Sequence, residues 1–185
     1  GSKFLYPGCG YGGSCFPKDV KALARTAREY GYTMGVIEAV EAVNERQKEI
    51  VVKKLQDKLG TLRGKTIALW GLAFKPETDD MREATSLVTI KLLLKEGCKV
   101  VVYDPIAMQE CMRRIGEVVT YANNMYDCVF NADALLLLTE WKIFRLPKWN
   151  VLKERMVVPL LIDGRNLYDH NEVISNGIIY MSIGS

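Results

Sequence analysis

Residues 65–72 read KTIALWGL, an aliphatic run that ends in glycine. Such a run, bounded by a turn signal, is typical of a buried strand. The chain then alternates: residues 84–96 predict a helix, and CKVVVYDP (98–105) predicts a second strand that Pro105 ends. Strands that are apolar throughout and alternate with helices indicate a parallel sheet covered on both faces.

The alternation continues to the end of the chain. Expected strands are VVTYA (118–122), ADALLLLTE (132–140), VVPLLIDGR (157–165) and an edge strand in NGIIYMSI (176–183), and further helices are expected at 107–115 and 124–131. The fold class is therefore α/β, with a Rossmann-like parallel sheet over about residues 63–185. No G-x-G-x-x-G fingerprint follows Gly71, and Asp104 lies too far along the chain to serve as the usual ribose-binding acid. The residues alone do not predict an NAD site in this sheet.

Residues 1–62 have a different character, because a glycine-rich loop leads into helices. One helix is expected from about Lys18 to Tyr30, and one long helix over residues 34–59. The apolar residues of the long helix fall on one stripe: Val40, Val43, Ile50, Val51, Leu55 and Leu59. A helix of this length favours packing against another subunit, so a homodimer through residues 34–59 is expected.

The composition excludes several classes of protein. A net charge of +3, spread along the chain, does not indicate a nucleic-acid partner. Neither a long apolar span nor a signal-peptide pattern is present, so no membrane partner is expected. The five cysteines have scattered spacings, which favours a reducing compartment, the cytoplasm, over a disulfide framework or structural zinc. His170 is the single histidine, in LYDHNE, and is interpreted as a loop residue.

The stretch GYGGSCFPKDVKAL (10–23) places one cysteine between a glycine-rich turn and a helix start. If Pro17 opens the helix, Cys15 lies near the positive end of the helix dipole, with Lys18 close by, and both favour a thiolate. Asp19 follows about one turn later, where a carboxylate suits a base or a water-orienting group. The alternative, a buried structural cysteine after a tight turn, has equal weight on these residues alone.

Charged residues also follow the expected strands. Lys75 and Arg82 lie in GLAFKPETDDMREA (71–84), and Arg165 follows the strand at 157–165. These positions fall at the carboxyl edge of the sheet, where ligands of such folds bind, and a guanidinium there suits a phosphate or a carboxylate. The alternative for Lys75 and Arg82 is that they are solvated loop charges. The segment TEW (139–141) is interpreted as a helix start after a strand.

Four motifs together resemble the UDP-glucose 6-dehydrogenase family, and in particular its bacterial members. They are GGSCFPKD, GLAFKPETDDMREA, ADALLLLTEW and IDGRNLYD, in the family's order and spacing, and the resemblance covers essentially the whole chain. It implies an NAD-dependent oxidation of UDP-glucose to UDP-glucuronate through a thiohemiacetal and a thioester. It also implies two parts: the cysteine loop and the end of a central dimerisation region (1–62), and a UDP-sugar-binding domain (63–185).

Carried over by position, the resemblance gives roles to individual residues. Cys15 is implied as the nucleophile and Asp19 as the residue that assists it. The implied substrate-binding residues are Tyr6, Pro7, Gly8, Cys9, Gly10, Tyr11, Gly12, Phe74, Lys75 and Arg165. The implied residues near the NAD are Cys15, Phe16, Pro17, Lys18 and Arg82, and no metal is implied.

The family's N-terminal NAD domain has no counterpart in this sequence. We therefore expect the chain to be the C-terminal portion of a longer dehydrogenase, inactive alone. One alternative is a standalone sugar-nucleotide-binding or dimerisation module. Another is a dehydrogenase acting on GDP-mannose or on an N-acetylated UDP-hexosamine; Ser14 and Lys18 point away from the hexosamine enzymes.

Overall fold

The computed structural model describes residues 7–184, which contain one parallel sheet of six strands. The strands are β1 (Thr66–Trp70), β2 (Lys99–Tyr103), β3 (Thr120–Tyr121), β4 (Ala134–Leu137), β5 (Leu160–Asp163) and β6 (Ile179–Ser182). Their order is β3-β2-β1-β4-β5-β6, which confirms the predicted Rossmann-like sheet and its edge strand. The strand order reverses between β1 and β4, and ligands of such sheets bind at that switch point, outside the carboxyl ends of the strands.

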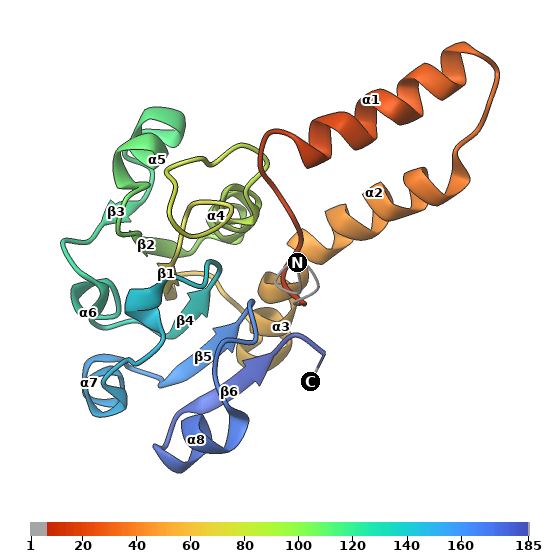
Figure 1. Cartoon of the computed structure of the whole chain (residues 1–185). Coiled ribbons are helices and arrows are strands. Elements are labelled where there is room, and N and C mark those ends of the chain that lie inside the picture. Colours follow the sequence, from red (N-terminus) through yellow and green to blue (C-terminus); the bar gives the residue numbers. More distant parts are fainter. Residues whose placement is uncertain (1–6, 185) are drawn as a thin grey trace.

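Helices cover both faces of the sheet. They are α4 (Thr85–Lys95), α5 (Met108–Ile115), α6 (Met125–Cys128), α7 (Trp149–Arg155), α8 (His170–Ser175) and the 3-10 helix η2 (Lys142–Phe144). In Figure 1, α6, α7 and α8 lie on one side of the sheet and α4 on the other. Strands shielded on both faces must be apolar throughout, and every residue of β4 and β5 is indeed buried.

The N-terminal helices form an arm and a support. α1 (Phe16–Glu29) and α2 (Gly35–Lys48) run side by side and project away from the sheet (Figure 1). α3 (Ile50–Leu59) packs against β5 and α4. Because Gly8–Gly13 lead directly into α1, the position of the arm also sets the position of the glycine-rich loop. Within residues 7–184, no helix combines the length and the apolarity needed to cross a membrane.

The prediction of one helix over residues 34–59 is wrong, because the helix breaks at Glu49. The N–H of Glu49 donates to the carbonyl of Arg46, three residues back, at 3.2 Å, whereas an α-helix bonds four residues back. The predicted apolar stripe divides at the same point. Leu55 in α3 is fully buried, whereas Val40 and Val43 in α2 are 39% and 53% exposed.

The structure also corrects the interpretation of His170 as a loop residue. His170 is the first residue of α8. The carboxylate of Asp169 accepts a hydrogen bond from the backbone N–H of Glu172 at 2.9 Å and so caps the helix. This Asp-x-x-Glu pattern is a recognisable helix start. The helix start expected at TEW (139–141) is confirmed by η2, whose N-cap is Trp141, whereas α7 was not predicted.

Candidate functional site

Asp104 organises the carboxyl edge of the sheet at the end of β2. Its carboxylate is 1% exposed and accepts five hydrogen bonds. The donors are the backbone N–H groups of Leu72 (2.7 Å), Ala73 (3.2 Å), Ile106 (2.9 Å) and Ala107 (2.8 Å) and the indole of Trp141 (3.0 Å). The acid that in a dinucleotide-binding sheet would hold a ribose therefore fixes the loop after β1 here.

Asp163 plays the corresponding part at the end of β5. Its buried carboxylate accepts hydrogen bonds from the backbone N–H groups of Arg165 (2.9 Å), Leu167 (2.7 Å) and Tyr168 (3.2 Å) and from the hydroxyl of Tyr180 (2.8 Å). Burial raises the pKa of Asp163, although these hydrogen bonds act in the opposite direction. The backbone that carries Arg165 is thus held rigidly beside the switch point.

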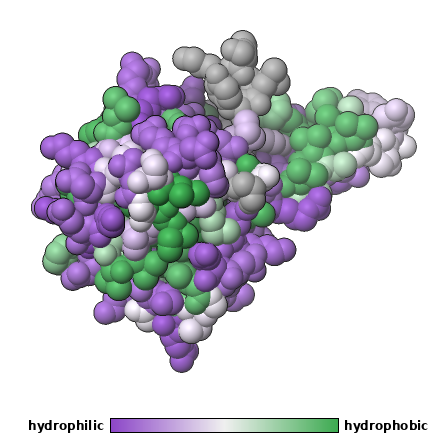
Figure 2. Space-filling model, turned by 90° about the horizontal axis from the view of Figure 1, so that it is seen from below, coloured by the Kyte–Doolittle hydropathy of each residue, from purple (hydrophilic) through white to green (hydrophobic). Residues whose placement is uncertain are grey.

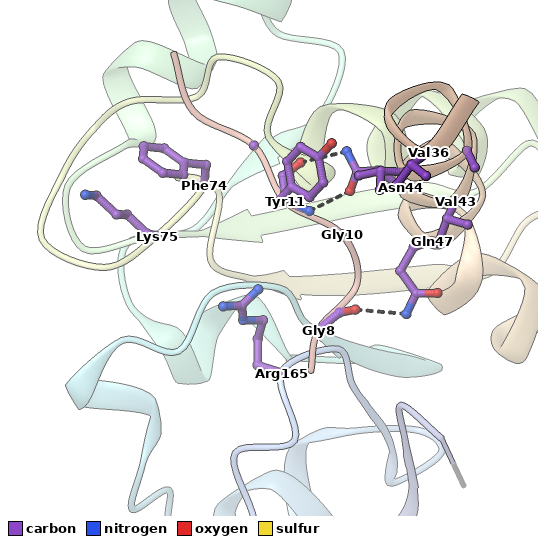
Figure 3. A pocket seen from close by; sticks show the side chains of 13 residues that line it. Gly8, Gly10, Tyr11, Val36, Val43, Asn44, Gln47, Phe74, Lys75 and Arg165 are labelled. Carbon is purple, nitrogen blue, oxygen red and sulfur yellow. Dashed lines mark hydrogen bonds between the residues drawn. The ribbon is translucent and has the colours of Figure 1, made fainter. Parts of the chain in front are cut away.

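A hollow of about 680 Å³ lies between this edge and α2. Figure 3 shows Phe74 and Lys75 on one side, Arg165 below them, and the loop with Gly8, Gly10 and Tyr11 running between these residues and α2. Seven predicted substrate-binding residues line it: Gly8, Gly10, Tyr11, Gly12, Phe74, Lys75 and Arg165. The structure therefore brings together three chain segments that are far apart in sequence.

Two of the predicted substrate-binding residues that the structure describes, Pro7 and Cys9, are not part of this lining. Pro7 is exposed, and Cys9 is completely buried against Gly164, where burial raises the pKa of its thiol to about 11. Cys9 has a structural role instead, since its N–H donates to the carbonyl of Gly164 at 2.9 Å. The predicted residue Tyr6 lies outside the described residues.

One wall of the hollow was missed by the sequence-based prediction. It consists of residues of α2: Val36, Ala39, Val40, Val43, Asn44 and Gln47. Their spacing of three and four is the signal of one helix face. Val40 and Val43 belong to the predicted apolar stripe, but periodicity does not distinguish a helix face that packs on a core from one that lines a pocket.

Polar side chains of α2 hold the glycine-rich loop in place. Gln47 Nε2 donates to the carbonyl of Gly8 at 2.9 Å. Asn44 Oδ1 accepts from the N–H of Tyr11 at 2.8 Å, and Asn44 Nδ2 donates to the carbonyl of the same residue at 3.2 Å. The Tyr11 hydroxyl donates to Glu41 at 2.6 Å. Side chains of α2 thus provide hydrogen-bond partners for backbone groups of this loop, which is not paired in a β-sheet.

The same loop packs directly on the segment 71–84. The N–H of Gly13 donates to the carbonyl of Arg82 at 2.7 Å. A Cβ at position 12 would lie 2.4 Å from the carbonyl oxygen of Glu83, and one at position 13 would lie 2.8 Å from the Phe74 ring. Gly13 also has a φ of +95°, which disfavours any other residue. Only glycines allow this close approach.

Cys15 directly precedes α1 and is the one exposed cysteine of the five, all of which are free thiols. Ser14 Oγ lies 3.7 Å from its Sγ. The pKa of Arg82 is raised, chiefly by its hydrogen bond to Asp80. The predicted nucleophile is therefore accessible.

Asp19 lies one turn further along α1. Its backbone N–H donates to the carbonyl of Cys15 at 2.8 Å, whereas its exposed carboxylate lies 3.9 Å from Lys18 Nζ. In the described part of the chain, the recorded ion pair of Asp19 is thus with Lys18. The expected assistance of Cys15 by Asp19 remains a prediction.

A second hollow, of about 530 Å³, opens on the other side of the loop. Its lining residues are Gly13, Ser14, Lys18, Lys21, Arg82, Glu83 and Arg114. Lys18 and Arg82 were predicted as cofactor-binding residues, whereas Lys21 and Arg114 were not. Of the other residues predicted there, Pro17 is buried, and Phe16 packs edge-to-face on Tyr11 with ring centroids 4.8 Å apart. Different residues of the glycine-rich loop therefore line two hollows: residues 8–12 line an apolar one that contains Lys75 and Arg165, and Gly13 and Ser14 line one with four basic residues, each of which is ion-paired.

Sequence comparison connects both parts of the site with one family. Residues 68–170 match the UDP binding domain of the UDP-glucose/GDP-mannose dehydrogenase family, and residues 1–46 match its central domain. The chain belongs to this family. Within residues 7–184, no group of three His, Cys, Asp or Glu side chains is arranged to hold a metal.

Curated relatives of this dehydrogenase family agree with the match. UDP-glucose 6-dehydrogenase of Pseudomonas aeruginosa is 49% identical to the whole chain, which covers 42% of that protein. UDP-glucose 6-dehydrogenase TuaD of Bacillus subtilis is 44% identical, again over the whole chain and 40% of the relative. The chain thus spans about two fifths of the length of these relatives.

Solved structures show the same fold. A UDP-glucose dehydrogenase from Pyrobaculum islandicum superposes with a TM-score of 0.82 at 34% identity, covering 94% of this chain and 38% of that one. An NDP-N-acetyl-D-galactosaminuronic acid dehydrogenase from Methanosarcina mazei superposes with a TM-score of 0.81 at 28% identity, covering 97% of this chain and 39% of that one. The arrangement of sheet and arm is therefore common to members that differ in the sugar named.

Proposed function

We propose that the chain forms the sugar-nucleotide-binding and thiol-bearing part of an NAD-dependent UDP-glucose 6-dehydrogenase. The reaction would be UDP-glucose, two NAD and water to UDP-glucuronate. The observation that carries this proposal is the position of the loop that leads to Cys15. Gly8, Gly10, Tyr11 and Gly12 line the hollow that holds Lys75 and Arg165, and Gly13 and Ser14 line the hollow at Arg82.

The first hollow suits a sugar nucleotide in shape and in chemistry. Phe74 and Tyr11 offer aromatic faces, and Lys75 and Arg165 offer donors for phosphate, hydroxyl or carbonyl oxygens. The carbonyls and N–H groups of the 8–12 loop add backbone polar groups to the same wall. We propose Gly8, Gly10, Tyr11 and Gly12 as the sugar-facing residues, and Lys75 as the phosphate-binding cation.

Cys15 supplies the covalent chemistry in this proposal. After the C6 hydroxyl has been oxidised to the aldehyde, Sγ adds to C6 and gives a thiohemiacetal. Oxidation of that adduct gives a thioester, which water hydrolyses to the carboxylate, and the sulfur leaves as a thiol or thiolate. Asp19 would orient the water.

NAD, when bound, accepts the hydrides that the two oxidations remove. Its negatively charged phosphates fit the second hollow, where Lys18, Lys21, Arg82 and Arg114 converge. The sheet itself lacks the glycine fingerprint, and the carboxylate of Asp104 already accepts five hydrogen bonds from the protein. The dinucleotide would therefore not bind after β1, where a dinucleotide-binding sheet holds it. We therefore propose that the chain alone does not reduce NAD.

Three accompanying proposals concern organisation. We propose a boundary near residue 62 between the helical part and the UDP-sugar-binding domain. We propose a homodimer formed through the arm. The five free cysteines fit a cytoplasmic protein.

Calorimetric titration of the chain with UDP-glucose tests the function directly. Wild type should bind UDP-glucose more tightly than GDP-mannose, and Lys75→Met should weaken UDP-glucose binding by about tenfold. Cys15→Ser should bind as wild type does, because the thiol is needed for chemistry and not for affinity. Lys58→Met, on the exposed surface of α3, serves as the matched control. Absence of UDP-glucose binding by wild type would refute the proposal, and equal binding of GDP-mannose would refute the base preference.

A further inference from the structure

Glu140 lies shortly after the carboxyl end of β4, in the segment TEW (139–141). The interpretation of this segment as a helix start does not explain its charged side chain. Both neighbours are buried, Thr139 at 1% exposure and Trp141 at 6%. Thr139 Oγ1 donates to the carbonyl of Ala73 at 2.6 Å, and the indole of Trp141 donates to Asp104 at 3.0 Å. The backbone of Glu140 is therefore anchored on both sides.

The side chain of Glu140 is engaged with Arg165. Arg165 Nη2 donates to Oε1 at 3.1 Å, and Nε lies 2.7 Å from Oε2. The Nε and Oε2 atoms are both buried, and among the described residues neither has a hydrogen bond. Removal of Glu140 would thus leave a buried Nε without its counter-charge, which is costly.

The third nitrogen of the guanidinium, Nη1, lies at the Gly8 side of the hollow. Nη1 lies directly over Gly8, where a Cβ would be 2.7 Å from it. Figure 3 shows the guanidinium rising between Lys75 and the Gly8 loop. The backbone N–H of Arg165 is bonded to Asp163 at 2.9 Å, so neither the backbone nor the Nε–Nη2 edge is free to turn.

The two cations that line the hollow therefore differ in effective charge. Arg165 is offset by Glu140 at ion-pair distance. Within residues 7–184, no carboxylate pairs with Lys75, whose Nζ lies over the Phe74 ring, 5.2 Å from its centroid. An anion entering the hollow meets a net positive charge at Lys75 and a neutral pair at Arg165.

We propose that Glu140 is a positioning residue that makes Arg165 a hydrogen-bond donor to an uncharged acceptor of the ligand, a carbonyl or hydroxyl oxygen. The negatively charged phosphates are then left to Lys75. This inference rests on the proposed function, because it assumes a nucleotide in the hollow. It gives Glu140 a part in selectivity: the hollow prefers a whole nucleotide over a bare polyphosphate.

The test compares UDP with inorganic pyrophosphate, titrated calorimetrically into the full chain at constant ionic strength. Glu140→Gln frees the charge of Arg165 and loosens its orientation. Pyrophosphate should then bind more tightly, and the preference for UDP should fall by about tenfold. Glu77→Gln removes an exposed carboxylate of the same edge that pairs with Lys142, and should leave the preference unchanged.

A double-mutant cycle separates positioning from a general effect. In an Arg165→Ala background, Glu140→Gln should no longer change the preference. An unchanged preference in Glu140→Gln alone, or an equal fall in both backgrounds, would overturn the inference. If Glu140→Gln is not folded by circular dichroism, Glu140→Asp keeps the charge and should retain most of the preference. Failure of wild type to bind UDP would instead refute the proposed function.

Discussion

At the scale of single residues, two buried aspartates decide where the functional side chains lie. Asp104 collects five donors and Asp163 four, and together they fix the loops that carry Lys75 and Arg165. Each carboxylate accepts hydrogen bonds from backbone N–H groups of loop residues, which have no partner in a helix or a strand. The two aspartates therefore act on the proposed binding site through the residues that they position.

We expect Asp104→Ala to destabilise the chain by about 3 kcal/mol or more, because five donors around a buried site would lose their acceptor. Asp104→Asn should cost less, since one amide oxygen remains as an acceptor. Urea unfolding followed by circular dichroism measures both. Asp57→Ala, on the exposed side of α3, is the control and should change stability by less than about 0.5 kcal/mol. A loss for Asp104→Ala no larger than that of the control would contradict this role.

The accessibility of Cys15 gives a second prediction. Because the other four cysteines are buried, a thiol reagent such as DTNB should react rapidly with one thiol of the folded chain and with five in urea. Cys15→Ser should abolish the rapid reaction, and Cys9→Ser should leave it unchanged. Rapid reaction of two or more thiols in the folded chain would show that Cys15 is not distinguished by exposure.

At the scale of elements, a charge network connects the arm to the sheet. Lys48, at the end of α2, is 1% exposed and contacts Glu45 at 2.9 Å and Glu83 at 3.2 Å. Burial alone would lower the pKa of Lys48, but the hydrogen bonds to both glutamates outweigh it and leave the pKa raised. Glu83 also pairs with Lys21 of α1 at 3.1 Å. One carboxylate thus joins both helices of the arm to the loop before α4, directly beneath Gly12.

Two glutamates with a lowered pKa, Glu83 of this network and Glu110 of α5, predict a loss of stability in acid. Hydrogen bonds from Lys21 and then Lys48 lower the pKa of Glu83 against the effect of burial, and the hydrogen bond from Arg113 is the main cause that lowers the pKa of Glu110 to about 2. A lowered pKa means stability that is present above the unfolded value of 4.5 and lost as the pH falls through the folded value. The free energy of unfolding should therefore decrease between about pH 4.5 and pH 2.

Glu83→Gln identifies the contribution of the arm. The variant should be less stable than wild type at pH 7 and should lose less stability on acidification, because one of the titrating carboxylates is absent. Urea midpoints at pH 7, 4 and 3 measure the difference. Glu154→Gln, an exposed glutamate at the end of α7, should follow wild type at every pH. Parallel pH profiles for wild type and Glu83→Gln would disprove the assignment.

At the scale of the whole molecule, the arm exposes more apolar surface than a surface helix pair needs. Phe16 and Leu23 of α1 and Tyr30, which directly follows it, are spaced seven residues apart, and they are 49%, 50% and 86% exposed. Figure 2 shows apolar side chains gathered along the projecting arm. Contiguous exposed apolar surface of this kind is typical of an interface. The proposed homodimer would bury it.

We expect the chain to sediment as a dimer at micromolar concentration and Leu23→Asp to shift it to monomer, because a charge in an apolar interface is costly. Analytical ultracentrifugation measures the masses. Leu146→Asp, at an 88% exposed position far from the arm, should remain dimeric. A wild-type monomer would refute the dimer. Equal dissociation by both variants would place the interface elsewhere.

The sequence by itself determined the architecture of the sheet and the identity of the cysteine loop. Short apolar runs such as those within 65–72 and 132–140 favour strands buried on both faces over helices, because they are bounded by turn signals and are too short for a typical helix. The family motifs likewise named Cys15, Lys75 and Arg165. These signals lie within short stretches of sequence, so they can be recognised without knowledge of the fold.

Only the tertiary structure decided which side chains face one another. The break at Glu49, the wall that α2 contributes to the hollow and the contact of Glu140 with Arg165 all depend on packing between distant segments. Periodicity reports which face of a helix is apolar but not whether that face meets a core, a ligand or a partner. GYGGSCFPKDVKAL contains the thiol, but the position of the loop that leads to it depends on Glu83, Asn44 and Phe74, which contact the loop from distant parts of the sequence.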